Sequence, residues 1–147
     1  MSHDRADWHY GGDFPADLKP EAGGTHIGMF LGWAILRGLE GEDHQEDSGE
    51  SIQALRERRM SGRDFLMNVC DEKFIDDDLN DEGNAFVAAY YNKDGPGGYL
   101  ADYEEALGGS TLPSLYHVDN SWENFDKLTP ILDQRFAEWK ATKSHAR

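Results

Sequence analysis

Three residues in the first part of the chain carry side chains that could bind a ligand or transfer a proton. His9, Asp13 and His26 supply two imidazoles and a carboxylate, the groups used in general acid–base catalysis and in metal binding. If they meet in space, they form a candidate pocket for a small enzyme or a ligand-binding protein. Their spacing matches no local metal-binding pattern, because the chain has neither a His-x-x-x-His pair nor a Cys-x-x-Cys pair. The sequence therefore predicts no metal and no other cofactor.

His26 also has a simpler structural interpretation. It follows Thr25, a good helix-capping residue, at the start of the most apolar stretch of the chain. A histidine in that position is expected to be buried and to form a hydrogen bond with the preceding segment, Trp8–Asp13. The structural and the chemical interpretation both stay open at this point.

A second candidate is an incomplete calcium loop. The residues Asp78, Asn80, Glu82 and Gly83 match the first half of an EF-hand loop, with glycine at the sixth position. The twelfth position is Ala89, where the loop needs a bidentate glutamate. The sequence therefore favours a solvated acidic surface over a calcium site.

The single cysteine, Cys70, is predicted to be a core residue and not a nucleophile. It lies between Val69 and Asp71, and acidic neighbours disfavour the reactive thiolate. One cysteine allows no internal disulfide, which fits a reducing cytoplasm. The sequence shows no secretion signal and no membrane-spanning stretch, so we expect a cytoplasmic protein.

The charge balance limits the kinds of partner. The 147 residues include 14 lysines and arginines against 29 aspartates and glutamates, a net charge of −15. Nucleic acids and anionic membranes would be repelled, so we expect neither as a partner. A basic protein partner is favoured, because opposite charges accelerate association.

Two acidic runs contribute most to this charge. Residues 40–50 contain no aliphatic side chain and are expected to form a loop. Residues 71–83 mix acidic and apolar side chains, so this run is expected to reach the core and also to bind a partner. The predicted partner-binding residues are Phe74, Asp76, Asp77, Asp78, Leu79, Asp81 and Glu82.

The elements that must position these residues are mainly helical. Residues 26–39 have apolar side chains on two faces of a helix, which is typical of a central, buried helix. Gly28 and Gly32 lie one turn apart and form a flat strip where another element can approach. Ser61 is expected to cap a further helix, with Asp64 completing a capping box. Residues 85–91 are expected to be helical, and 112–118 extended.

The whole chain, residues 1–147, is expected to be a single compact helical domain of the mainly α class, with room for a few short strands. Residues 1–24 are expected to form a loop-rich N-terminal segment. In the last helical region, Thr129 and Pro130 are expected to produce two helices or a kink. The tail, residues 142–147, is expected to be frayed.

The chain resembles a family of small uncharacterised bacterial proteins. The similarity rests on HYGGDFP at residues 9–15 and THIGMFLGWAI at residues 25–35, with WENFDK (122–127) and RFAEW (135–139) near the end. The family implies no particular activity. Small acidic proteins of this kind are similar to immunity proteins of bacterial toxin systems, which implies a protein partner and no catalytic residues.

The leading functional prediction is therefore an immunity protein that inhibits a cognate secreted bacterial toxin. The acidic surface would pair with the lysines and arginines of a basic active-site cleft, and no enzymatic activity is expected. The alternatives are a small enzyme or ligand-binding protein using the His9, Asp13 and His26 pocket, and an adaptor in a bacterial assembly. An adaptor would need an exposed apolar patch. The sequence predicts no oligomeric state.

Overall fold

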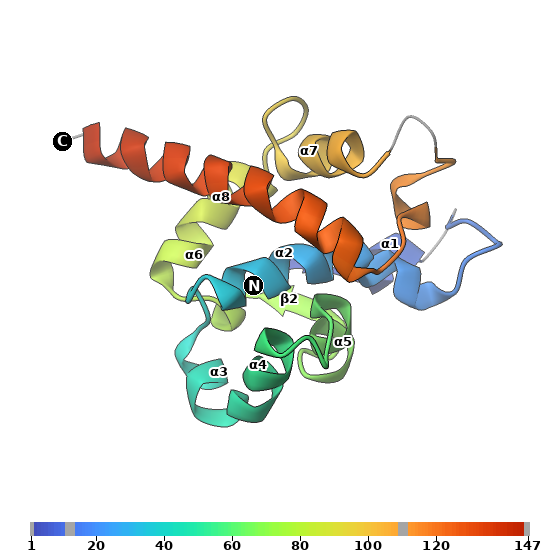
Figure 1. Cartoon of the computed structure of the whole chain (residues 1–147), viewed down its shortest axis with the longest axis horizontal. Helices are drawn as coiled ribbons and strands as arrows, with labels where there is room; N and C mark the ends of the chain where they lie inside the picture. The colour runs from blue at the N-terminus through green and yellow to red at the C-terminus, as the bar shows by residue number, and fades with distance from the viewer. Residues whose placement is uncertain (1, 11–13, 109–111, 146–147) are drawn as a thin grey trace.

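The chain folds around one central helix, as Figure 1 shows. A computed structural model describes residues 2–10, 14–108 and 112–145. Its elements, in order, are β1 (Ser2–Arg5), α1 (Asp7–Tyr10), η1 (Pro20–Gly24), α2 (Thr25–Leu36), α3 (Glu42–Asp47), α4 (Gly49–Arg56), α5 (Gly62–Asn68), β2 (Lys73–Ile75), η2 (Asp76–Asp78), α6 (Asp81–Phe86), the π-helical η3 (Val87–Tyr91), α7 (Tyr99–Ala106), η4 (Leu115–His117) and α8 (Trp122–His145). The predicted mainly α fold is confirmed.

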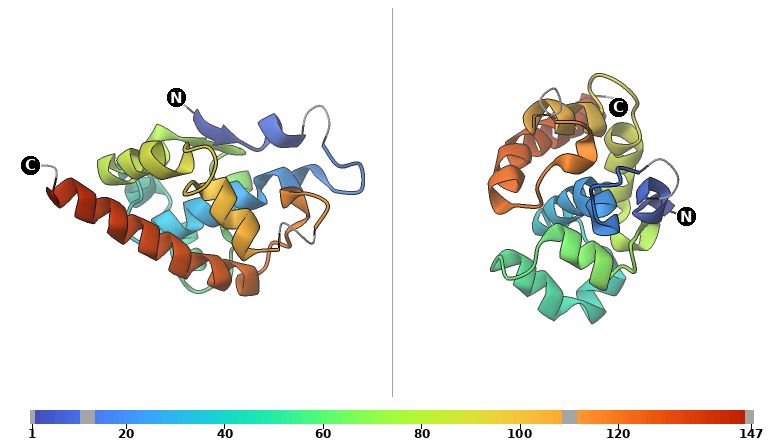
Figure 2. Two further views of the ribbon diagram at one scale, coloured as in Figure 1. Left: turned by 90° about the horizontal axis from the view of Figure 1, so that it is seen from above. Right: turned by 90° about the vertical axis from the view of Figure 1, so that its right-hand side faces the viewer.

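Helix α2 is the central element. All of its residues from Thr25 to Ile35 are buried, which agrees with apolar side chains on more than one face. Figures 1 and 2 show it between α8 on one side and α3, α4 and α5 on the other. The helix begins at Thr25 itself, directly after η1, so Thr25 is not its cap. It ends before Gly38, which has a φ of 81° in the left-handed region that glycine tolerates.

The glycine strip on α2 is where α5 packs. A Cβ atom on Gly28 would collide with the backbone of Arg63, and a Cβ atom on Gly62 would collide with the carbonyl of Gly28. A Cβ on Gly32 would lie 3.1 Å from Cα of Gly62. The two helix backbones therefore touch, which confirms the predicted close approach.

The start of α5 is the predicted capping box. Ser61 Oγ accepts a hydrogen bond from the Asp64 backbone N–H at 3.1 Å, and Asp64 Oδ2 accepts one from the Ser61 N–H at 3.3 Å. These bonds satisfy two amide groups at the helix start. They fix the end of α5 that contacts the glycine strip.

Residues 40–50 are not the predicted loop. They contain α3 and the first residues of α4. Glu42 and Asp43 lie in the first turn of α3, where negative charge is favourable. The local sequence does not reveal the second reason, which is that His44 is buried and anchored to another part of the chain.

The N-terminal segment has more regular structure than predicted. β1 pairs antiparallel with β2, with Asp4 opposite Phe74 and Arg5 opposite Lys73. Residues 7–10 form the short helix α1, where a loop or extended piece is expected from the sequence. The sheet thus ties β1 to a strand that lies far from it in the sequence. Similarly, residues 115–117 form the 3₁₀-helix η4 where an extended connector is predicted.

The last helix, α8, is continuous. Pro130 lies inside it, so the predicted alternative of two separate helices is wrong. Pro130 and Asp126, whose carbonyl loses its helical partner, are both exposed, so water can replace the missing bond. The helix extends to His145, so the tail predicted to fray from residue 142 is helical up to that point, and residues 146–147 lie outside the described part.

Candidate functional site

The two acidic runs meet at a hollow in the surface. It has a volume of about 710 Å³ and lies between α3, η2 and α6, with His3 of β1 at its side. Its carboxylates belong to Glu42, Asp43, Asp76, Asp77 and Asp81. None of the described residues that line it is a lysine or an arginine. The hollow is therefore a strongly negative, concave surface.

Backbone hydrogen bonds hold the two runs together. The Asn80 N–H donates to the Leu39 carbonyl at 2.8 Å, and the Gly41 N–H donates to the Asp78 carbonyl at 2.9 Å. Gly41 must be glycine for this approach, because a Cβ there would collide with the Asp77 carbonyl. The repulsion between the acidic side chains is thus resisted by main-chain pairing.

Asparagine side chains complete the frame of the hollow. Asn84 Nδ2 donates to the carbonyls of Asp76 at 2.9 Å and Leu79 at 3.2 Å, and Asn84 Oδ1 lies 2.8 Å from His3 Nε2. Asn80 caps α6 by accepting the backbone N–H of the third helical residue. The site is therefore built from fixed elements and not from a loose loop.

The structure corrects part of the predicted partner surface. Asp76, Asp77 and Asp81 line the hollow, as an acidic binding surface requires. Phe74 is 0% exposed and does not line the hollow, and Leu79 lines it but is only 4% exposed, so neither side chain can form the centre of an interface. Phe74 points inward because it occupies the buried position of the short strand β2.

Two further predicted residues do not line the hollow. Glu82 is exposed, and its carboxylate lies 3.5 Å from Lys140 Nζ on α8. Asp78 is only 5% exposed, so the prediction that it is solvated is wrong. Its carboxylate faces inward because it joins a buried polar cluster.

That cluster connects α3 to the segment after β2. Asp78 Oδ1 lies 2.7 Å from His44 Nε2 and 3.4 Å from Cys70 Sγ, and Asp78 Oδ2 accepts the Ile75 N–H at 2.8 Å. His44 Nδ1 lies 2.9 Å from Ser48 Oγ. Each of these side chains has a partner, so the cluster is a structural link under the floor of the hollow.

Cys70 should be chemically inert in the folded protein. Burial, together with the charge of Asp78, raises the pKa of its thiol well above the ordinary value. Because only the thiolate reacts, iodoacetamide at pH 8 should alkylate Cys70 at least about a hundredfold more slowly in the native protein than in urea. Mass spectrometry of timed samples measures both rates. Equal rates would contradict the inert, structural assignment.

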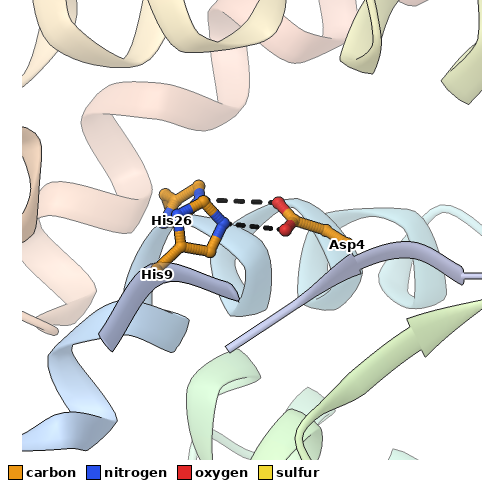
Figure 3. A group of neighbouring side chains, drawn as sticks. All are labelled: Asp4, His9 and His26. Atoms are coloured by element: carbon orange, nitrogen blue, oxygen red, sulfur yellow. Dashed lines mark hydrogen bonds and ion pairs between the residues drawn. The ribbon is translucent and has the colours of Figure 1, made fainter. Parts of the chain in front are cut away.

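A second polar cluster joins β1, α1 and α2, and Figure 3 shows both histidines directed toward the carboxylate of Asp4. His9 Nε2 lies 2.7 Å from Asp4 Oδ1, and His26 Nε2 lies 3.6 Å from Asp4 Oδ2. Tyr91 donates its hydroxyl to Asp4 Oδ2 at 2.6 Å, and the Tyr116 hydroxyl lies 2.8 Å from His9 Nδ1. His9 and His26 thus meet as the pocket alternative requires, with a different carboxylate between them. Asp13 lies outside the described residues.

His26 has the predicted place but not the predicted partner. It is 1% exposed at the second position of α2. Its contact with the Trp8–Asp13 segment is an edge-to-face ring contact with His9, with centroids 4.5 Å apart. Neither ring nitrogen has a hydrogen-bond partner among the described residues, since Asp4 is at ion-pair distance only.

The electrostatics of this cluster follow from burial and proximity. Burial would raise the pKa of Asp4, but the contacts with His26 and His9 and the Tyr91 hydrogen bond outweigh it and hold that pKa below its ordinary value. Burial lowers the pKa of His26, and the nearby Asp4 opposes this effect only in part. These shifts favour the ionised form of the Asp4 carboxylate and the neutral form of the buried His26 imidazole.

Sequence reasoning missed Asp4 and His44. The partner of His44 is 34 positions away, and Asp4 is brought to His26 by the pairing of β1 with β2. Neither contact has a local spacing that could be recognised. A single histidine within an otherwise acidic run is the one signal that points to His44.

The fold and its two sites define a mainly helical, acidic protein with a negatively charged hollow and a buried Asp–His–His cluster. Residues 2–118 match a domain of unknown function, DUF7832, and the chain belongs to that family. No curated protein and no solved structure matches the chain. Among the described residues, no helix is both long and apolar enough to cross a membrane.

Proposed function

We propose that the protein is an immunity protein that binds and inhibits a bacterial toxin through the acidic hollow. The observation that carries this proposal is that two acidic runs, separate in the sequence, converge on one concave surface. Its exposed carboxylates would pair with the lysines and arginines that a nuclease or nucleotide-using toxin needs to hold phosphates. Occupying those residues would block access of the substrate.

The concentration of negative charge on one surface supports a role in recognition. Like charges gathered on one surface destabilise the compact state. Here backbone bonds between residues 39–41 and 78–80 hold the runs together in spite of that repulsion. A basic partner would neutralise these charges and so remove the repulsion. It would also associate faster, because its positive charge is attracted to the negative surface.

The alternatives have different support. An adaptor needs an exposed apolar patch, and the large hydrophobic side chains exposed in the described part are Trp8 and Leu100. This favours the acidic hollow as the binding surface. The enzyme alternative rests on the Asp4, His9 and His26 cluster, which lies outside the hollow.

Protection of cells tests the proposal. The protein is produced in bacteria together with a candidate toxin, the product of a gene adjacent to its own, and growth is followed after induction of that product. We expect full growth with the wild-type protein and growth arrest without it, because a bound toxin cannot reach its substrate. Arrest in both cultures, despite soluble protein, would overturn the immunity function.

A further inference from the structure

We propose that Asp4, His9 and His26 form a binding site for a divalent transition-metal ion of the zinc type. The proposal goes beyond the acidic hollow and does not depend on it. Two imidazoles and one carboxylate are a donor set that binds Zn²⁺ and leaves coordination positions open.

The ligand atoms are already close together. One oxygen of Asp4 and one nitrogen from each of His9 and His26 all lie within 4.8 Å of one another. Three ligands of a tetrahedral zinc ion lie about 3.4 Å apart, so small side-chain rotations would be enough. Figure 3 shows the rings of His9 on α1 and His26 on α2 both directed toward the carboxylate of Asp4 on β1.

The independent observation is the state of His26. Its side chain is almost completely buried, and neither ring nitrogen has a hydrogen-bond partner among the described residues. An unpartnered buried polar group destabilises the folded state, so natural structures rarely keep one without a reason. A metal ion bound to Nε2, the nitrogen directed toward Asp4, would supply a partner at that atom.

The surroundings fit a metal site. Tyr116 contacts the other nitrogen of His9 and Tyr91 contacts the carboxylate of Asp4, which are the outer hydrogen bonds that orient metal ligands. The His9 side chain is 19% exposed, so an ion can enter from its side. Two imidazoles also select against Ca²⁺ and Mg²⁺, which prefer oxygen ligands.

The cluster of His44, Cys70 and Asp78 has similar residue types, but its structure gives less reason to expect a bound metal ion. Its ligand atoms also lie within 4.8 Å of one another. However, both nitrogens of His44 and both oxygens of Asp78 already have partners. This cluster needs no ion, and it therefore provides the matched control.

The test is zinc binding by the full-length protein without an affinity tag. The protein is treated with a chelator, exchanged into metal-free buffer and equilibrated with Zn²⁺. Inductively coupled plasma mass spectrometry then measures the bound zinc per chain. Co²⁺ absorption then reports the ligand type. We expect one ion per chain and a rise in melting temperature, because binding to the native state stabilises it.

Four variants locate the ion. His9→Gln and Asp4→Asn should each weaken binding at least about a hundredfold, because even outer-shell changes cost about 10–100-fold. His44→Gln and His3→Gln should bind as the wild type does. His9 is partly exposed, so His9→Gln is the variant most certain to fold, and circular dichroism checks each one.

Three results would overturn the site. The first is no zinc bound by the wild-type protein, with no change in its melting temperature. The second is loss of the ion in His44→Gln but not in a folded His9→Gln, which would place it in the other cluster. The third is unchanged binding in all four variants, which would mean that surface carboxylates hold the metal. None of these results depends on whether the protein protects cells from a toxin.

Discussion

Gly28→Ala is expected to lower the free energy of unfolding by about 3 kcal/mol or more, because the added methyl group has no space and α5 must move. The Cβ atom would collide with the backbone of Arg63 and with Gly62, and backbone cannot rotate away as a flexible side chain can. Small domains are stable by only about 5–15 kcal/mol, so such a loss is a large fraction of the total. Urea denaturation followed by circular dichroism measures it.

Gly49→Ala is the matched control for this substitution. Gly49 lies in α4, and nothing is within 4 Å of the position that its Cβ would take. The same added methyl should therefore be neutral or stabilise the protein by up to about 1 kcal/mol, because alanine has less conformational freedom to lose on folding than glycine. Equal stability of the two variants would show that α2 and α5 do not touch at Gly28.

Neutralising the acidic hollow is expected to slow association with the proposed toxin partner by tenfold or more. The change is Asp76→Asn, Asp77→Asn and Asp81→Asn together, which removes three charges from the lining. Charge pairing across an interface acts mainly on the association rate, so the dissociation rate should change less. Surface plasmon resonance or stopped-flow fluorescence measures both rates.

Salt gives a second measurement of the same effect. Raising the salt concentration from about 50 to 500 mM shortens the screening length from about 14 to about 4 Å. The association rate of the wild-type protein should fall, and that of the triple variant should fall much less. An association rate that ignores salt would contradict the charge-steered mechanism.

The control variant carries the same change in net charge at a different place. Glu46, Asp47 and Glu50 are exposed and do not line the hollow, so their neutral variants should retain most of the association rate. Glu42 and Asp43 line the hollow, so this control leaves them unchanged. Asp78 is left unchanged because it is buried and its loss would disturb the fold.

Much of the fold follows from local patterns in the sequence. The burial of α2 follows from its apolar residues, and the start of α5 follows from Ser61 and Asp64. These features depend on residues within a few turns of one another, so the sequence displays them. Helix α3 could not be predicted in this way, because the contact that anchors it joins His44 to Asp78, which lies far along the chain.

The candidate sites were predictable only in part. The clustered carboxylates drew attention to Asp76, Asp77 and Asp81, which line the hollow, but their meeting with α3 depends on main-chain pairing that no side-chain pattern encodes. His9 and His26 were recognised by residue type. The carboxylate between them was not, because only the register of β1 against β2 places Asp4 there.

The pairing of β1 with β2 also fixes the order in which the protein can be completed on the ribosome. β1 is synthesised long before residues 73–75, which must be present before the sheet can form. The hydrogen bond between His9 and Tyr116 needs a still longer chain. Such contacts across the sequence form late, after the helices that depend on near neighbours. The inner part of the cluster, Asp4 with His9 and His26, can therefore form only after β2 has been made, and the cluster gains its Tyr116 hydrogen bond later still.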